Sequence, residues 1–168
     1  WATHDAAKYA CENWHYSRNM PAGSHNKIGV WENGKFIGVL LFGRPAFPSI
    51  GKPYGLTQFE IIELVRISLD KHVSEVTKMI SIAIKFVKKH NPKIKMIVSF
   101  ADKNQGHYGG IYQGSNWIYV GEGGAKIQYK LFGKEIHQRN LQHKFGKNFR
   151  NHPAVVAYKP EPKFKYLF

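Results

Sequence analysis

Cysteine, acidic side chains and long hydrophobic runs are all scarce in this sequence. The single cysteine, Cys11, cannot form an internal disulfide, so nothing indicates an oxidising compartment. No apolar run reaches the roughly 18 residues that a membrane span needs, and no signal-peptide pattern opens the chain. We therefore expect a cytoplasmic protein with no membrane segment.

The shortage of acidic residues leaves a large positive charge. The chain has 25 Lys and Arg against 11 Asp and Glu, a net charge of +14. Polyanions, and nucleic acid above all, are the expected partners of such a protein. The charge is concentrated in 126–168, where histidines and aromatic side chains that could stack on bases are interleaved with it. Arg44, Lys144, Lys147 and Arg150 are the expected nucleic-acid contacts, and the alternative is a solvated basic face that only maintains solubility.

Hydrophobic periodicity and turn signals predict a mixed α/β protein. In chain order we expect a helix over 4–14 capped by Thr3, two strands over 27–43 joined at Asn33-Gly34, a strand over 59–69, a helix over 73–91 capped by Ser74, a strand over 94–102, a short turn or helix, strands over 117–122 and 125–133, and a helix over 135–146. The central strand–helix–strand unit predicts a right-handed parallel crossover. The length favours one domain over 1–168, with 126–168 as its basic C-terminal part.

The stretch "VSFADKNQGHYGGIYQGSNWIYVG", 98–121, is unusual for a stable core because an apolar strand runs into glycines and tyrosines. Asp102 follows the strand, at the edge where open α/β sheets bind ligands. It could accept a proton or ligate a metal, and the alternative is that it caps the next turn. Tyr112 could protonate a leaving group, or it could simply pack with its hydroxyl satisfied. Ser99 is a further candidate, expected on the opposite face from Asp102 unless the strand has ended.

Three more polar residues are catalytic candidates. His15 and Tyr16 follow the first predicted helix, where two such rings could serve acid–base chemistry or stack on a base, or could form an ordinary packed cap. In the strand over 59–69, Phe59, Ile61, Val65, Ile67 and Leu69 are expected on one face, and Glu60, Arg66 and Ser68 on the other. An arginine among apolar residues needs Glu60, Glu63 or a bound anion as a partner.

The order of elements resembles the GNAT acyltransferase fold. In that fold a short helix after the fifth strand carries Ala or Gly, then Tyr, then Gly-Phe, and "GGIYQGSNWIYVG" is similar, with Tyr112 at the tyrosine and Asn116-Trp117 replacing Gly-Phe. The resemblance implies that Tyr112 protonates the leaving thiolate of an acyl donor. The glycine-rich pyrophosphate loop of these enzymes is replaced here by "LDKHVSEVTKM". Ser74 at a helix N-terminus and the nearby Lys71 could still bind an anion, and Ser68 and Tyr112 are the other expected cofactor contacts.

A closer resemblance is to the Mom family of DNA-modification proteins of Mu-like phages. It is carried by 15–23, 27–44, 63–69 and above all "IVSFADKNQGHYGGIYQGSNWIYVG" at 97–121. The resemblance implies an enzyme of the bacterial host cytoplasm that converts adenine in double-stranded DNA to N6-carbamoylmethyl adenine, which protects phage DNA from restriction. Simple acetyl transfer would give N-acetyladenine instead, so either a metal or radical step intervenes, or a different donor, such as a glycyl or other aminoacyl carrier, is rearranged. The expected donor is accordingly acetyl-CoA or another acyl or aminoacyl carrier.

The same resemblance implies further site residues. Iron is associated with the family, and His15, Asp102 and His107 are possible ligands, but the sequence has no typical metal-ligand spacing. Because enzymes that act on a base extrude it from the duplex, Tyr16, Tyr108 and Trp117 are candidates to sandwich the flipped adenine. Two other functions stay open: a GNAT-type N-acyltransferase for protein, tRNA or a small amine, and a basic DNA-binding module with a decayed active site.

Overall fold

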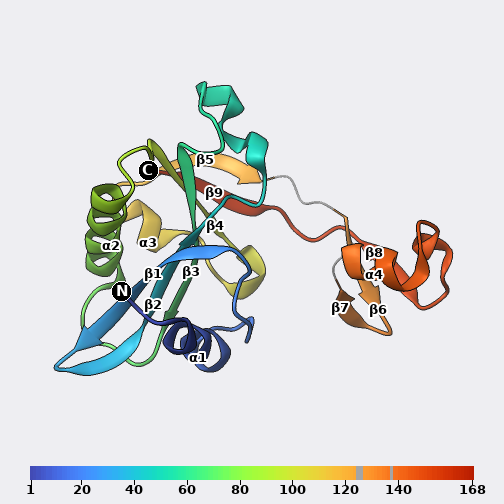
Figure 1. The fold of residues 1–168 in the computed structure, drawn as a ribbon, viewed down its shortest axis with the longest axis horizontal. Helices are drawn as coiled ribbons and strands as arrows, with labels where there is room; N and C mark the ends of the chain where they lie inside the picture. Colours follow the sequence, from blue (N-terminus) through green and yellow to red (C-terminus); the bar gives the residue numbers. More distant parts are fainter. Residues whose placement is uncertain (124–126, 137) are drawn as a thin grey trace.

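The computed structural model describes residues 1–123, 127–136 and 138–168. The described helices are α1 (His4–Trp14), α2 (Val76–His90), α3 (Gly110–Gln113) and α4 (Gln138–Phe145), with short 3-10 helices η1 (Pro48–Tyr54), η2 (Lys103–Gln105) and η3 (Phe149–Asn151). The strands are β1 (Ser24–Glu32), β2 (Lys35–Gly43), β3 (Ile61–Leu69), β4 (Met96–Ala101), β5 (Ile118–Gly123), β6 (Gln128–Leu131), β7 (Lys134–Ile136), β8 (Val155–Tyr158) and β9 (Lys163–Leu167). They form two separate sheets (Figure 1).

The larger sheet has six strands in the order β1-β2-β3-β4-β9-β5. Strands β3 and β4 are parallel and are connected through α2, which confirms the predicted crossover, while the other neighbours are antiparallel. Alternation along β2 places Leu40 and Phe42 in the core cluster with α2, and Val39 and Leu41 in the cluster with α1. The helices therefore cover opposite faces of the sheet. Among the described residues, no helix is long and apolar enough to cross a membrane.

Strand β3 contains an irregularity that changes which residues share a face. The pairing with β2 runs Leu41 to Arg66 and then Phe42 to Leu64, so the register shifts between these pairs. Leu64 and Ile67 consequently pack in the same core cluster, although three positions separate them. The predicted grouping of Ile61 with Ile67 and Leu69 is wrong for this reason, because Ile61 packs in another cluster. Phe59 lies before the strand and is exposed.

Most predicted helix boundaries agree with the structure. Helix α1 begins and ends as expected, and the Ala6 N–H donates to the Thr3 side chain that caps it. The Asn33-Gly34 turn joins β1 and β2 as predicted. The expected cap of α2 is wrong: the helix begins after Glu75, and the Ser74 side chain makes no capping hydrogen bond.

The C-terminal region differs most from the prediction. Residues 135 and 136, expected in a helix, lie in β7, so α4 begins only at Gln138 and ends at Phe145, before Gly146, whose φ of +73° suits glycine. Strands β7, β6 and β8 make the three-stranded sheet, and Tyr129, Leu141 and Phe149 form its core. We call the described residues of 127–158 the small unit. Strand β9 returns from it to the large sheet, between β4 and β5 (Figure 1), so the predicted part 126–168 is divided between the two sheets.

Candidate active site

A cavity of about 420 Å³ opens beside β3 and β4, and we call it the cleft. Its lining comes from the end of α1, the irregular part of β3, the end of β4, the loop over 102–109 and helix α3. Seven of the sequence-predicted candidates lie in it: His15, Tyr16, Arg66, Asp102, His107, Tyr108 and Tyr112. The structure thus brings together residues that are almost one hundred positions apart in the sequence.

The glycines of the cleft loop serve the protein's own packing. Gly106 and Gly109 have φ angles of +69° and +80°, which other residues rarely adopt. At Gly109 an added Cβ would overlap the ring of Tyr166, whose hydroxyl donates to the Tyr108 carbonyl at 2.9 Å. At this position, therefore, the glycine allows the backbone to lie close to strand β9.

Tyr112 is buried in the wall of the cleft, and its hydroxyl has a defined hydrogen-bond partner. The Ser99 Oγ lies 2.8 Å from both the Leu64 carbonyl oxygen and the Tyr112 hydroxyl. A carbonyl only accepts, so the single Ser99 proton goes to Leu64 and the Tyr112 hydroxyl donates to Ser99. Burial raises the pKa of Tyr112 to about 12, so the phenol keeps its proton at neutral pH. Ser99 therefore orients Tyr112 rather than lining the cleft itself.

Arg66 lies in the cleft without a carboxylate partner among the described residues. One of its terminal nitrogens donates to the backbone and side-chain oxygens of Asn19, while its buried Nε has no partner there. The two carboxylates that the sequence offered are engaged elsewhere, Glu60 with Lys95 and Glu63 with a backbone amide. Because a guanidinium pairs well with carboxylates and phosphates, Arg66 can receive an anionic group from a ligand.

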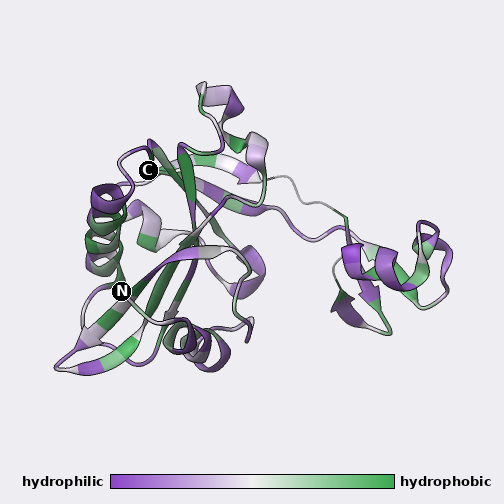
Figure 2. Cartoon of the chain, viewed as in Figure 1, coloured by the Kyte–Doolittle hydropathy of each residue, from purple (hydrophilic) through white to green (hydrophobic). Residues whose placement is uncertain are grey.

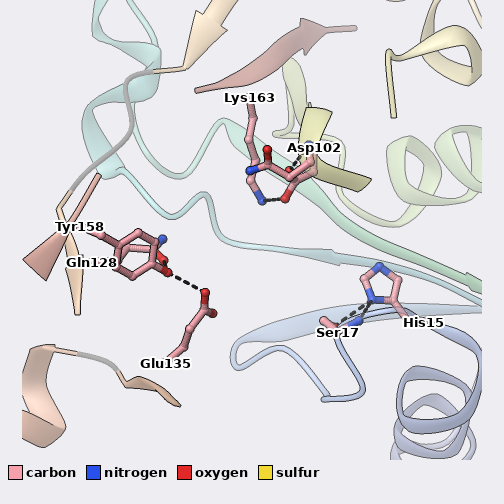
Figure 3. A network of polar contacts seen from close by, with 8 residues as sticks. His15, Ser17, Asp102, Gln128, Glu135, Tyr158 and Lys163 are labelled. Carbon is pink, nitrogen blue, oxygen red and sulfur yellow. Dashed lines mark hydrogen bonds and ion pairs between the residues drawn. The ribbon is translucent and has the colours of Figure 1, made fainter. Parts of the chain in front are cut away.

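His15 and Tyr16 form one rim of the cleft. The His15 Nδ1 accepts the backbone N–H of Ser17 at 3.1 Å, so the neutral ring carries its proton on Nε2 (Figure 3). Burial, followed by the nearby charges of Arg66 and other cations, lowers the pKa of His15 to about 4, so the ring is neutral at pH 7. The Tyr16 ring lies 4.1 Å from that of His15 and 5.8 Å from that of His107, centroid to centroid.

Asp102 caps the next turn, as one reading of the sequence allowed, and makes an ion pair that the sequence did not predict. Its Oδ1 accepts the Asn104 N–H at 3.1 Å and so caps η2, while its Oδ2 lies 2.8 Å from the Lys163 ammonium (Figure 3). Lys163, on β9, was missed by the sequence reasoning. The alternation of Lys163, Phe164, Lys165 and Tyr166 is typical of a strand and could have identified it.

The structure separates several predicted residues from the cleft. Trp117 is buried against Tyr112 and the C-terminal Phe168, so the prediction that it stacks on a base is wrong. Ser68 is fully buried against Cys11, and its predicted cofactor contact is wrong for the same reason.

The predicted anion site before α2 is occupied by the protein itself. The Glu32 carboxylate accepts the backbone N–H groups of Val73 and Ser74 at 3.0 and 2.6 Å. A hydrogen bond from the Ser74 side chain, followed by these backbone hydrogen bonds, lowers the pKa of Glu32 to about 2. Ser74 and the exposed Lys71 do not line the cleft, so the predicted cofactor role of this segment is not supported.

The predicted metal ligands share the cleft without forming a metal site. His15, Asp102 and His107 all line it. Within the described part of the chain, however, no group of three or more His, Cys, Asp or Glu side chains has an arrangement that could hold a metal ion. One Asp102 oxygen is occupied by Lys163 and the other by a backbone amide. The residues present therefore do not fit a resident iron ion.

The predicted nucleic-acid contacts fall in three places. Tyr108 lies at the cleft, and 68% of its surface is exposed. Arg44 is exposed just after β2. Lys144, Lys147 and Arg150 belong to the small unit and are exposed. The cleft and the basic surface are thus two separate regions.

Comparison with known proteins gives relatives of the chain. The model of the Mom protein family matches residues 1–168. The methylcarbamoylase mom of Escherichia phage Mu is 30% identical to the chain over 128 residues, which make up 74% of this chain and 53% of that protein. The chain spans about half the length of this curated relative.

Proposed function

Because this chain belongs to the Mom protein family, we propose that it is an enzyme that modifies adenine in phage DNA, with the cleft as its active site. The product that we propose is N6-carbamoylmethyl adenine, and its role is protection of the DNA from restriction. The name of the phage Mu relative, a methylcarbamoylase, supports this product. The observation that carries the proposal is the meeting of Tyr16, Asp102 and Tyr112 in one cavity.

The chemistry of group transfer to N6 requires two proton movements. As the new N–C bond forms, the exocyclic amine loses a proton, and the group that leaves the donor gains one. Asp102 is an acceptor at the cleft, where the Lys163 ammonium holds its carboxylate in place. Tyr112 keeps its proton at neutral pH and is the donor to the leaving group once its hydroxyl turns from Ser99 toward the donor. The Ser99 hydroxyl can then donate to the phenolate that remains.

The adenine must leave the duplex before it can enter the cleft. The exposed rings of Tyr16 and Tyr108 offer surfaces on which the flipped base stacks. A cavity of about 420 Å³ falls in the range of about 300–1,000 Å³ that is common for small-molecule sites.

The donor that we propose is a glycyl or other aminoacyl carrier. Transfer of the glycyl group to N6 displaces the carrier, and a redox-neutral rearrangement of N6-glycyl adenine gives the isomeric N6-carbamoylmethyl product, whereas acetyl-CoA would supply only an N-acetyl group. Arg66 is the residue of the cleft best suited to bind an anionic group of the donor, because it has no carboxylate partner among the described residues. The GNAT-like arrangement of β3, α2 and β4 supports an acyltransferase ancestry for this chemistry.

The test is mass spectrometry of nucleosides from DNA co-expressed with the protein. We expect adenosine heavier by a carbamoylmethyl unit, and a loss of about 100-fold or more with Tyr112→Phe, since general acid catalysis contributes about 10²–10⁴-fold. Tyr129→Phe is the matched control, because it removes a buried hydroxyl that accepts from Arg150 outside the cleft. Unmodified DNA together with release of a coenzyme A thiol would favour an N-acyltransferase for another amine instead.

A further inference from the structure

The small unit has two faces of different character. Helix α4 packs on one face of the three-stranded sheet through Leu141. On the other face the Tyr158 hydroxyl lies 2.9 Å from Gln128 Oε1 and 2.6 Å from Glu135 Oε1, and its one proton goes to the Glu135 carboxylate (Figure 3). Glu135 is the single acidic residue in the sequence from 127 to 158. This face is therefore the less suitable one for a polyanion.

The face that carries α4 is strongly basic. The exposed residues of the helix are Arg139, Asn140, Gln142, His143 and Lys144, and the exposed Lys147 and Arg150 follow it. The side chains of Asn140 and Gln142 make no hydrogen bond with other described residues. Purple colour, for hydrophilic residues, dominates the helix in Figure 2.

These side chains are the types that read base edges. Amide side chains pair with adenine in the major groove, arginine and lysine pair with guanine, and an α-helix fits that groove. Residues three and four positions apart lie on one helix face, so Gln142 shares a face with Arg139, and Asn140 shares a face with His143 and Lys144. Leu141 between the two amides faces the sheet, so Asn140 and Gln142 lie on either side of the outer edge of the helix. The basic residues beyond the helix supply phosphate contacts, which fix position without reading sequence.

We propose that α4 is a reading helix, which enters the major groove of duplex DNA and sets the sequence context of modification through Asn140 and Gln142. This inference rests on the proposed action on DNA. The small unit stands to one side of the large sheet (Figure 1), so it engages base pairs that flank the adenine in the cleft. Specificity and chemistry then reside in different sheets of the same chain.

The first experiment maps modified adenines in DNA from cells that express the wild type or N140A/Q142A. We expect the wild type to favour a subset of sequence contexts and the double variant to lose at least about fivefold of that preference, since one bidentate base contact is worth about 1–3 kcal/mol. An unchanged context distribution overturns the proposal. A uniform loss over all contexts also overturns it, because that result indicates phosphate contact alone.

The second experiment selects duplexes from a random pool with purified protein, which does not depend on modification. We expect the wild type to enrich particular sequences and N140A/Q142A not to do so, while K144Q/K147Q binds all sequences more weakly but enriches the same ones. Because all four side chains are exposed, thermal melting should match the wild type, and H143A provides an independent reading variant. If cellular DNA is unmodified but enrichment occurs, the proposed function fails and the reading helix stands. No enrichment by the wild type overturns the reading helix.

Discussion

The large sheet and the small unit use the same residue types in opposite ways. In the large sheet, helices cover both faces, and of the charged groups in the cleft Asp102 is paired with Lys163 while Arg66 has no carboxylate partner among the described residues. In the small unit, a three-residue buried core supports a surface with six Lys or Arg residues and one acid in the sequence from 127 to 158. The difference teaches that the overall charge of +14 does not locate the cleft, which lies beside the large sheet and not in the basic small unit.

The largest expected effect is a loss of stability in the large sheet, caused by a substitution at Gly109. Gly109→Ala forces a Cβ onto the Tyr166 ring at a φ of +80°. Overpacking costs about 1–3 kcal/mol and the left-handed backbone about 1 kcal/mol more, so we expect the free energy of unfolding to fall by about 2–4 kcal/mol. Denaturant midpoints measure this loss.

Gly106→Ala is the matched control for that variant. Gly106 has a similar φ of +69°, but an added Cβ meets no atom within 4 Å. We expect a loss of only about 1 kcal/mol. Equal losses in the two variants would show that the contact with β9 does not hold the cleft loop.

The next effect separates chemistry from DNA binding. Tyr16→Ala removes a stacking surface from the cleft, and since one stacked base is worth about 1–3 kcal/mol, we expect about 10–100-fold less modification. DNA affinity and thermal stability should stay near those of the wild type, because the ring is about half exposed, at 48%. Quantitative nucleoside analysis and binding titrations measure the two quantities.

Tyr9→Ala controls for the loss of any exposed tyrosine. Tyr9 lies on α1, is 54% exposed and packs against Trp14 outside the cleft. Its removal should leave modification unchanged. Parallel losses of modification and binding in Tyr16→Ala would argue against a part for Tyr16 in the cleft chemistry.

A smaller effect tests the small unit. Each lysine that contacts a phosphate contributes close to one unit to the slope of log K against log salt, so K144Q/K147Q should reduce that slope by about 2. The double variant K85Q/K89Q on α2 removes the same charge from the exposed side of the other region. If both variants reduce the slope equally, the small unit is no more important for phosphate contact than α2. DNA binding would then depend only on the total charge of the protein.

The smallest effect concerns pH. The pKa of His15 is lowered to about 4 in the folded protein from an ordinary value of 6.5, so the unfolded chain binds more protons between these values. Stability should therefore fall as pH drops from about 6.5 to about 4. The fall should be shallower in His15→Gln, and denaturant midpoints over this range measure it. Identical pH curves would contradict a buried, neutral His15.

Local signals in the sequence predicted much of the large sheet. The Thr3 cap, the Asn33-Gly34 turn and the apolar stripe of α2 each depend on neighbours within a few positions, and all three are present. The prediction for β3 failed because one irregularity reverses the alternation of faces, and the pairing with β2 that causes it is not local.

The sequence predicted which residues line the cleft better than it predicted the contacts that these residues make. The residue types of His15, Tyr16, Asp102 and Tyr112 are informative because polar groups at strand and helix ends attract ligands. The ion pair with Lys163 could not be predicted from spacing, because it depends on a strand that returns after the small unit. Trp117 was misassigned because an aromatic side chain that stacks on a base and one that fills a core look alike in sequence.

The position of β9 also determines when the cleft can be completed. Strands β4 and β5 stay unjoined until residues 163–167 have been synthesised, because β9 is the strand that hydrogen-bonds to both. Lys163 and Tyr166, which hold Asp102 and the Gly109 turn, arrive with that strand. On the ribosome, where chains emerge from the N-terminus first, the residues of the small unit are translated before the cleft can close. A nascent or prematurely terminated chain that lacks residues 163–167 therefore carries the basic small unit without a finished cleft.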